Sequence, residues 1–361
     1  MYNSLMYILS VNFPSWLKPE IIPGLPVRWY GLMYVFAFTT AFLVYRRQIK
    51  ERNFPMTDDG LYSLFGWGIL GLLLGARLFS TIIYETSDFY IRQPWLIFWP
   101  FRDGQFTGLM GMSYHGGAFC GLLAVIIYSK VKRLSFREIG DMYAASIPLG
   151  YTFGRLGNFI NAELYGRVTT GPLGMVFPKE TTRLFSTNEE WVREAVEKTG
   201  AVVTGGLVNL PRHPSQLYEM LFEGIILWLI IWFFRNRKPF KGFLIGLYFL
   251  GYGLFRFFIE YFREPDADLG YRVEFVKSSL PLAYVHPPLS FSTGQVLCFW
   301  MIVFGIVWLI ICSRLPGREP VRVYESGDGN TLKQKIVKSE TEKASERNRR
   351  RRLRRKIINN R

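Results

Sequence analysis

Apolar residues dominate seven runs of this chain, which polar and charged segments separate. The runs cover approximately residues 28–46, 61–84, 112–129, 139–160, 215–234, 242–261 and 293–312. At about 17–24 residues each, they are long enough for a helix to cross the hydrocarbon core of a bilayer. This pattern predicts an all-α polytopic membrane protein with about seven transmembrane helices.

Charges in the connecting loops predict how these helices are oriented. Basic clusters follow the first, third, fifth and seventh runs and begin at Arg46, Lys130, Arg235 and Arg314. Short cytoplasmic loops carry an excess of Lys and Arg, so these four loops are predicted to lie in the cytoplasm. The N-terminus is then expected outside the cytoplasm and the C-terminus inside.

The remaining segments complete the predicted domain organisation. Residues 1–27 form an extracytoplasmic N-terminal segment, and 28–315 form the membrane domain. Within that domain, about 161–212 are too polar for the membrane and read as a small extracytoplasmic head. Residues 316–361 carry too little apolar surface to fold alone, which predicts a disordered, basic cytoplasmic tail. No basic region, apolar stretch and cleavage site occur in the order of a signal peptide.

Composition supports the membrane interpretation. The 361 residues are 49% hydrophobic and 17% aromatic, and 44 Lys and Arg stand against 28 Asp and Glu. The positive charge lies in loop clusters and the tail, as the positive-inside rule requires, so no nucleic-acid partner is expected. Cys120, Cys298 and Cys312 lie in apolar runs without metal-ligand spacing, and we interpret them as small buried hydrophobes. No metal site is predicted.

Several polar residues interrupt the apolar runs near the predicted outer surface. Arg155 and Asn158 share one face of the fourth run, and Tyr252, Arg256 and Glu260 recur at every fourth position of the sixth. A cation facing hydrocarbon costs roughly 2.5–3.5 kcal/mol, so these groups predict a pocket. With few carboxylates apparent nearby, the two arginines favour an anionic ligand such as phosphate.

Other interpretations of these residues stay open. Arg256 and Glu260 are also spaced as a purely structural ion pair. His115 is either a general base, because imidazole titrates near neutrality, or an ordinary helix-end histidine. His213, which precedes Pro214, resembles a helix-entry cap more than a catalyst, and His286 lies in an external loop without visible partners.

The chain resembles the bacterial prolipoprotein diacylglyceryl transferases over approximately residues 26–312. The resemblance rests on the motifs Arg28–Tyr34, Ser113–Gly117, Gly154–Arg167, His213–Glu219 and Gly251–Asp266. It implies a seven-helix protein of the bacterial plasma (inner) membrane, with its site toward the extracytoplasmic leaflet. The implied reaction moves the sn-1,2-diacylglyceryl group of phosphatidylglycerol onto the lipobox cysteine of prolipoprotein signal peptides. A thioether forms, glycerol 1-phosphate leaves and no cofactor takes part in this first step of lipoprotein maturation.

The resemblance also assigns roles to residues. Arg155 and Arg256 are expected to hold the lipid phosphate, and His115 is the favoured group to deprotonate the substrate thiol. Further positions that match the family, and that are expected to orient the arginines and the headgroup, are Tyr30, Asn158, Glu163, Gly166, Tyr252 and Glu260. The chain departs from the family's glycine and serine pattern at Leu289–Gln295.

Two other functional classes compete with a transferase. A transporter or channel for anionic solutes also uses arginines within the membrane, but it predicts polar residues at all depths. The inner halves of the runs are almost wholly apolar and aromatic. A receptor or scaffold explains the head and the tail, but it leaves the polar groups of the fourth and sixth runs without a purpose.

Overall fold

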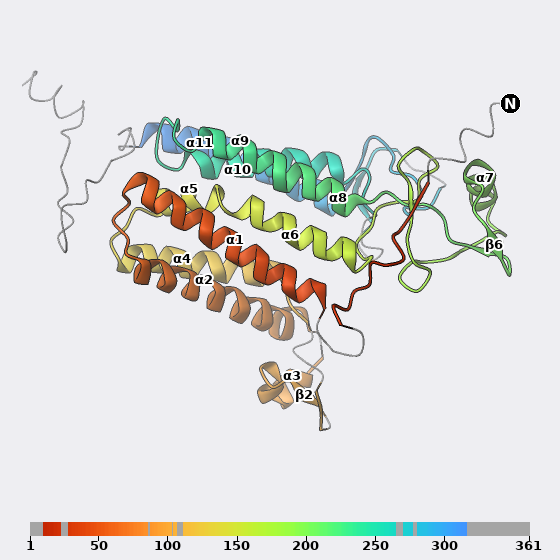
Figure 1. Ribbon diagram of the computed structural model, residues 1–361, viewed down its shortest axis with the longest axis horizontal. Helices are drawn as coiled ribbons and strands as arrows, with labels where there is room; N and C mark the ends of the chain where they lie inside the picture. The colour runs from red at the N-terminus through yellow and green to blue at the C-terminus, as the bar shows by residue number, and fades with distance from the viewer. Residues whose placement is uncertain are drawn as a thin grey trace, which may run out of the picture. The chain divides into compact units, whose positions relative to one another are not determined.

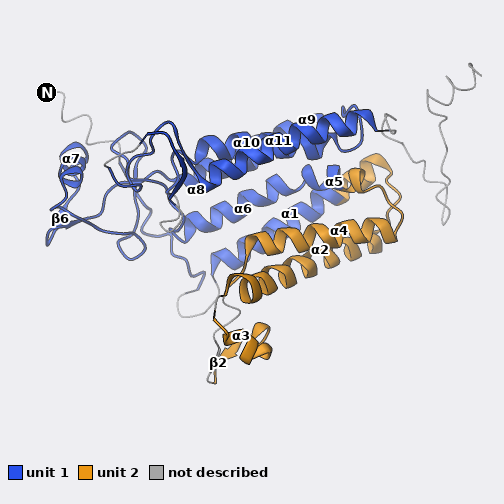
Figure 2. Ribbon diagram, turned by 180° about the vertical axis from the view of Figure 1, so that it is seen from behind, with its two compact units in different colours: residues 1–45, 140–316 blue, residues 46–139, 317–361 orange. Residues whose placement is uncertain are grey.

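The computed structural model describes residues 10–22, 28–85, 87–102, 104–106, 111–264, 270–276 and 280–315. The predicted tail over 316–361 lies outside them. The described residues are mostly helical, with a few short β-strands. The chain divides into two compact units, residues 1–45 with 140–316 and residues 46–139 with 317–361 (Figure 2).

Two long helices form the smaller unit. They are α2 (Asp58–Leu78), which continues as the π-helical segment η2 (Phe79–Tyr84), and α4 (Tyr114–Val131), and they run side by side (Figure 1). Glycines set their close approach: a Cβ atom on Gly75 would lie 2.3 Å from the carbonyl oxygen of Gly116. Small residues of this kind allow the backbones of membrane helices to touch.

The segment between these helices is fastened by Arg77. It contains α3 (Phe89–Arg92), the 3₁₀ turn η3 (Pro94–Ile97), and the strands β2 (Phe101–Arg102) and β3 (Gln105–Phe106). The buried Arg77 side chain donates to the carbonyl oxygens of Leu96 at 3.0 Å, of Gly111 at 3.2 Å and of Ile97. Arg77 therefore holds the backbone of the segment between α2 and α4. These carbonyl oxygens accept hydrogen bonds from its guanidinium group, so the group needs no ligand.

The larger unit holds the remaining long helices. In Figure 2 its helices α1, α6, α10 and α11 run side by side with the helix Ser215–Phe234. The elements are α1 (Trp29–Arg52, through Tyr45), α5 (Phe136–Ala144, from Gly140), α6 (Ile147–Ile160), the consecutive segments α8 (Ser215–Glu219), η4 (Met220–Ile226) and α9 (Leu227–Phe234), α10 (Phe243–Ile259) and α11 (Thr293–Arg314). The start of α10 is fixed by the fully buried Asp141, which accepts the backbone N–H of Leu244 at 2.9 Å and of Ile245 at 3.2 Å and pairs with Lys238 at 2.7 Å.

Helices occupy all seven ranges that the sequence predicts, with one correction. The fourth range, 139–160, was expected to be continuous but is broken between α5 and α6. Pro148 is the cause, because it has no N–H to donate and its ring restricts the preceding backbone. The fifth range is continuous but contains the π-helical segment η4.

Four stretches in the described part of the chain are long and apolar enough to cross a membrane. They are Asp58–Tyr84, Tyr114–Val131, Ser215–Phe234 and Thr293–Arg314, and α10 is a shorter apolar helix. The seven crossings and their orientation stay predictions.

Beyond one end of the helices, the larger unit has a small α/β region that contains most of the predicted head (Figure 1). Its elements are α7 (Glu190–Thr199), the antiparallel sheet β5 (Phe185–Ser186), β7 (Leu207–Val208) and β6 (Val203–Thr204), and the parallel pair β1 (Val11–Asn12) and β4 (Met175–Val176). Trp191, Val192 and Leu210 lie in its apolar core. The antiparallel pair β8 (Tyr271–Glu274) and β9 (Ser290–Ser292) leads into α11.

Candidate functional site

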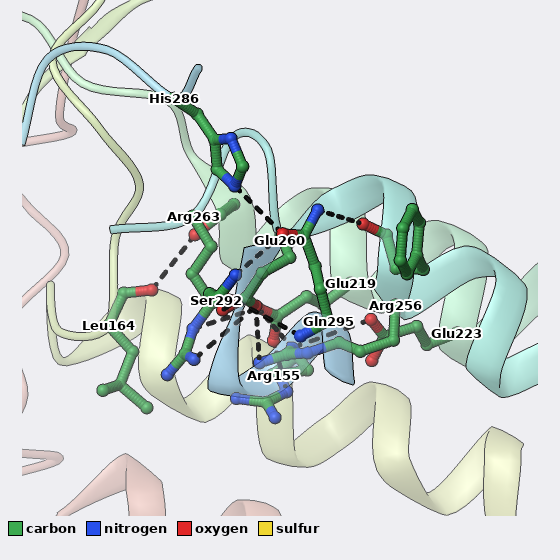
Figure 3. Close-up of polar contacts among 12 residues, drawn as sticks. Arg155, Leu164, Glu219, Glu223, Arg256, Glu260, Arg263, His286, Ser292 and Gln295 are labelled. Carbon is green, nitrogen blue, oxygen red and sulfur yellow. Dashed lines mark hydrogen bonds and ion pairs between the residues drawn. The ribbon is translucent and has the colours of Figure 1, made fainter. Parts of the chain in front are cut away.

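Arg155 and Arg256 converge on one carboxylate group, that of Glu219. Arg155 comes from α6 and Arg256 from α10, and Glu219 ends α8 with 1% of its side chain exposed. Arg155 Nε lies 2.7 Å from Glu219 Oε2, and Arg256 Nη1 lies 2.9 Å from Glu219 Oε1 (Figure 3). The two arginines that the sequence singled out thus lie at one site.

A second carboxylate, that of Glu223, lies beside Glu219 in the segment η4. The Tyr151 hydroxyl donates to Glu223 Oε2 at 2.5 Å and accepts a hydrogen bond from Arg155 Nε at 2.6 Å. Arg256 Nη1 is 3.7 Å from Glu223 Oε1. Tyr151 therefore links Arg155 to a carboxylate that also faces Arg256.

Glu260 and Arg263 complete the charged cluster. Glu260 Oε2 lies 3.6 Å from Arg256 Nη2 and 4.0 Å from Arg263 Nη1. Arg263 Nε is in turn 3.7 Å from Glu219 Oε1. The ion pair of Arg256 with Glu260 that the spacing suggested is present, but Arg256 lies closer to Glu219. The Arg256–Glu260 pair is therefore one contact of a larger network.

The six charged residues balance in formal charge. We call Arg155, Arg256, Arg263, Glu219, Glu223 and Glu260 the charged cluster, and their side chains are at most 19% exposed. The expectation that few carboxylates lie near the arginines is wrong. Glu219 and Glu223 were missed as partners, although two carboxylates at i and i+4 inside an apolar run are themselves a signal of a site.

The cluster retains unused hydrogen-bonding capacity. Buried atoms without an aligned hydrogen bond to the described residues include Arg256 Nη1, Arg263 Nε, Glu219 Oε1, Glu223 Oε1 and Glu260 Oε2. Each of these atoms still lies in an ion pair, 2.9–4.0 Å from the opposite charge. A polar ligand or water can use the hydrogen-bonding directions that these ion pairs leave open.

Asn158 and Glu163 support Arg155 from the end of α6. Arg155 Nη1 donates to Asn158 Oδ1 at 3.3 Å, and Asn158 Nδ2 donates to Glu163 Oε1 at 2.9 Å. Gln216 at the start of α8 donates to the backbone carbonyl of Glu163 at 2.6 Å. Polar contacts thus connect the signature segment to the helix that carries Glu219.

The roles expected of Tyr30, Gly166 and Tyr252 stay predictions, and the structure shows the contacts of each. The Tyr252 ring meets the Tyr151 ring edge-on at 6.0 Å, and a Cβ atom on Gly157 would lie 3.2 Å from Tyr30 Cδ2. Gly166 donates its N–H to the carbonyl of His213 at 2.8 Å. A Cβ atom there would lie 2.3 Å from the carbonyl oxygen of Phe262, so Gly166 must lack a side chain.

The three histidines differ in setting. His115 is exposed at the start of α4, in the other compact unit, with its Nδ1 3.2 Å from the Tyr84 hydroxyl, and its role as a base stays a prediction. His213 does not cap α8; it contacts the Tyr218 hydroxyl at 3.3 Å, and burial lowers its pKa to about 4, so it is neutral at pH 7. The expectation that His286 has no partner is wrong, because its Nε2 atom lies 3.1 Å from Gln295 Oε1.

Within the described ranges, His, Cys, Asp and Glu residues form no group of three that could hold a metal ion.

Comparison with known proteins gives a consistent family. The model of the family described as prolipoprotein diacylglyceryl transferase matches residues 19–311. The phosphatidylglycerol–prolipoprotein diacylglyceryl transferase of Treponema denticola is 52% identical over 321 residues, which cover 84% of this chain and 95% of the relative. The protein of the same name from Treponema pallidum is 50% identical over 329 residues, covering 87% and 99%.

A more distant relative gives the same result. The phosphatidylglycerol–prolipoprotein diacylglyceryl transferase of Chlorobaculum tepidum is 39% identical over 305 residues, covering 83% of this chain and 91% of the relative. The matched regions include the helices that carry Arg155, Glu219 and Arg256. With its apolar helices and these matches over most of its length, this chain is a multi-pass membrane protein that belongs to the prolipoprotein diacylglyceryl transferase family.

Proposed function

We propose that this protein transfers the sn-1,2-diacylglyceryl group of phosphatidylglycerol to the thiol of the lipobox cysteine in prolipoproteins. The names of the relatives support the reaction. The observation that carries the proposal for the site is the convergence of Arg155 and Arg256 on Glu219. Two planar guanidinium groups at one buried position suit the oxygens of a phosphate.

The proposed chemistry is a displacement at carbon. The cysteine sulfur attacks the glycerol carbon that carries the phosphate, a C–S bond forms, and the bond from that carbon to the phosphate oxygen breaks. The electron pair leaves with glycerol 1-phosphate, and the thiol proton goes to a base. Negative charge grows on the phosphate as it leaves, so fixed cations stabilise the transition state more than the bound lipid.

The carboxylates of the charged cluster prepare the arginines for this role. Glu219 takes Arg155 through Nε and Arg256 through Nη1. A guanidinium group has five N–H donors, so each arginine retains donors for phosphate oxygens while Glu219 holds it. The bonds of Arg155 to Tyr151 and Asn158 fix its orientation before the lipid arrives.

His115 is the proposed base for the thiol. The thiolate is the attacking form, and an imidazole group can accept the proton near neutral pH. The test is separate from that of the arginines. If His115→Gln retains near-normal turnover, this role is excluded while the transferase proposal stands.

The proposed setting is the bacterial inner membrane, crossed by about seven helices with the N-terminus outside and the C-terminus in the cytoplasm. The loop charges and the apolar helices support it. In this orientation the charged cluster lies toward the extracytoplasmic leaflet. There, phosphatidylglycerol and the signal peptide of a translocated prolipoprotein can meet.

The decisive experiment uses purified protein in detergent with phosphatidylglycerol and a lipobox peptide. Mass spectrometry follows the modified peptide, and a coupled assay follows glycerol 1-phosphate. We expect Arg155→Ala and Arg256→Ala each to lower turnover by about 100-fold or more, because each removes a contact to the leaving group. Near-normal turnover in both variants would exclude the phosphate role.

Two controls sharpen this experiment. Arg47→Ala removes an exposed arginine that pairs with Glu51 at 2.8 Å, and it should leave turnover unchanged. A peptide with serine in place of the lipobox cysteine should give no glycerol 1-phosphate. Release that persists with the serine peptide would identify the reaction as lipid hydrolysis.

A further inference from the structure

The first turn of α11 is built as a capping box around Ser292. The Ser292 Oγ atom accepts the backbone N–H of Gln295 at 3.2 Å, and Gln295 Oε1 accepts the backbone N–H of Ser292 at 3.0 Å. Both side chains are buried. This arrangement satisfies two donors at the start of the helix and leaves the hydroxyl proton of Ser292 for another partner.

That partner is Glu260 of the charged cluster. Ser292 Oγ lies 3.0 Å from Glu260 Oε1. An ionised carboxylate only accepts hydrogen bonds, so the serine hydroxyl must be the donor. The backbone closes around the same oxygen, because a Cβ atom on Gly294 would lie 2.7 Å from Glu260 Oε1. The N-terminus of a helix also favours a negative charge.

The other oxygen of Glu260 faces the arginines. Glu260 Oε2 is 3.6 Å from Arg256 Nη2 and 4.0 Å from Arg263 Nη1. One carboxylate thus joins the start of α11 to two cations of the cluster. A change that releases Oε1 also allows Oε2 to move, and the arginines lose a fixed counter-charge.

An external contact continues this hydrogen-bonded chain. His286 Nε2 lies 3.1 Å from Gln295 Oε1, the oxygen that also caps α11. His286 packs against the ring of Tyr261 at 4.3 Å. The segment Leu289–Gln295 thus contacts the charged cluster through Ser292, and His286 contacts that segment through Gln295.

We propose that Ser292, oriented by Gln295, is a positioning residue for the transfer reaction: its hydroxyl holds Glu260 where the carboxylate fixes Arg256 and Arg263. This inference rests on the proposed function of the cluster. Arg256 can still reach the phosphate of bound lipid when Glu260 is loose. It is then poorly placed for the charge that develops on the leaving group, which slows the chemical step more than it weakens lipid binding.

The test compares turnover and the KM for phosphatidylglycerol in full-length Ser292 variants, with the lipobox peptide saturating. Ser292→Ala removes both the cap and the bond to Glu260, and we expect kcat to fall about tenfold or more while KM changes less than about threefold. Ser292→Thr retains both contacts and should restore kcat to within about threefold of the wild type. Ser292→Gly retains a residue that is tolerated well as an N-cap but has no hydroxyl group, and it should be folded and as impaired as Ser292→Ala.

A matched control separates positioning from loss of a cap. Thr57 at the start of α2 accepts the backbone N–H of Gly60 at 3.1 Å, so Thr57→Ala also removes an N-cap. Thr57 is distant in sequence from the charged cluster, so this variant should retain wild-type kcat. Wild-type kcat in Ser292→Gly, or an equal loss in Thr57→Ala and Ser292→Ala, would overturn the inference. A wild-type protein that transfers nothing would instead overturn the proposed function.

Discussion

Glu219 is the residue on which the arrangement of the arginines depends. Its two carboxylate oxygens take Arg155 and Arg256, one each, and Glu219 Oε1 also faces Arg263. Without it, buried cations would face one another with less compensation, which is strongly unfavourable where water is scarce. In the proposed reaction, the negative charge of Glu219 also opposes the binding of a phosphate beside the arginines, because like charges repel. Glu219 then has two roles: it keeps the site folded in the absence of lipid, and it helps the product to leave.

The variant Glu219→Gln tests this dual role. Removing one partner of a buried ion pair costs about 3–5 kcal/mol, so we expect a lower Tm and a loss of turnover. Thermal unfolding in detergent and the peptide assay measure the two effects. Asp141→Asn is the matched control, because Asp141 is also fully buried and paired, with Lys238. It should lower Tm but retain turnover per folded molecule, and equal losses of turnover in the two variants would contradict a specific role of Glu219.

The pair α2 and α4 shows how glycines set the geometry of an element. Gly75 and Gly116 face one another so closely that a Cβ atom on either would lie within 2.4 Å of the other's carbonyl oxygen. Gly116 and Gly117 directly follow His115 in α4, and glycines allow another backbone to approach closely. The structure shows a backbone there, that of α2. The direction in which α4 presents His115 therefore depends on this contact.

Gly75→Ala should disturb this contact. The added methyl group has no space, and overpacking of this kind costs about 1–3 kcal/mol, which lowers the Tm measured in detergent. Gly66→Ala is the control in the same helix, because a Cβ atom there meets nothing within 4 Å. Alanine is the better helix former, so Gly66→Ala should be neutral or stabilising by up to about 1 kcal/mol. Equal Tm values for the two variants would show that the close approach of Gly75 and Gly116 is not needed.

At the scale of the whole molecule, sequence and structure agree where local rules decide and differ where packing decides. Apolar length located the helices of the seven predicted runs, though not the shorter α3 and α7, and spacing placed Arg155 beside Asn158. Spacing along the chain could not predict that Glu219 is the partner of both arginines. Glu219 meets Arg155 and Arg256 only because α8 packs against α6 and α10 in the fold. Chain order also gave no hint that His286 returns to the start of α11. Contacts between segments distant in sequence require the fold.

The predicted orientation of the molecule can be tested by labelling introduced cysteines in intact cells with a membrane-impermeant maleimide. A cysteine at Val202, which is 81% exposed in the region after α7, should react in intact cells. A cysteine at the exposed Asn236, in the basic loop before α10, should react only after the membrane is opened. The native Cys298 and Cys312 are buried and Cys120 is half-buried, so the unmodified protein is labelled in parallel to measure the background. The reverse pattern of labelling would refute the orientation.

The π-helical segment η4 has a consequence for how this helix tolerates change. A π turn accommodates one additional residue, and one residue rotates an α-helix by about 100°. Glu219 precedes the segment and the apolar α9 follows it. The bulge thus uncouples the angular register of Glu219 from that of α9 beyond it. A single-residue insertion or deletion in η4 after Glu223 can be absorbed by forming or removing the bulge, whereas elsewhere in the same helix it would turn one functional face away from its partners.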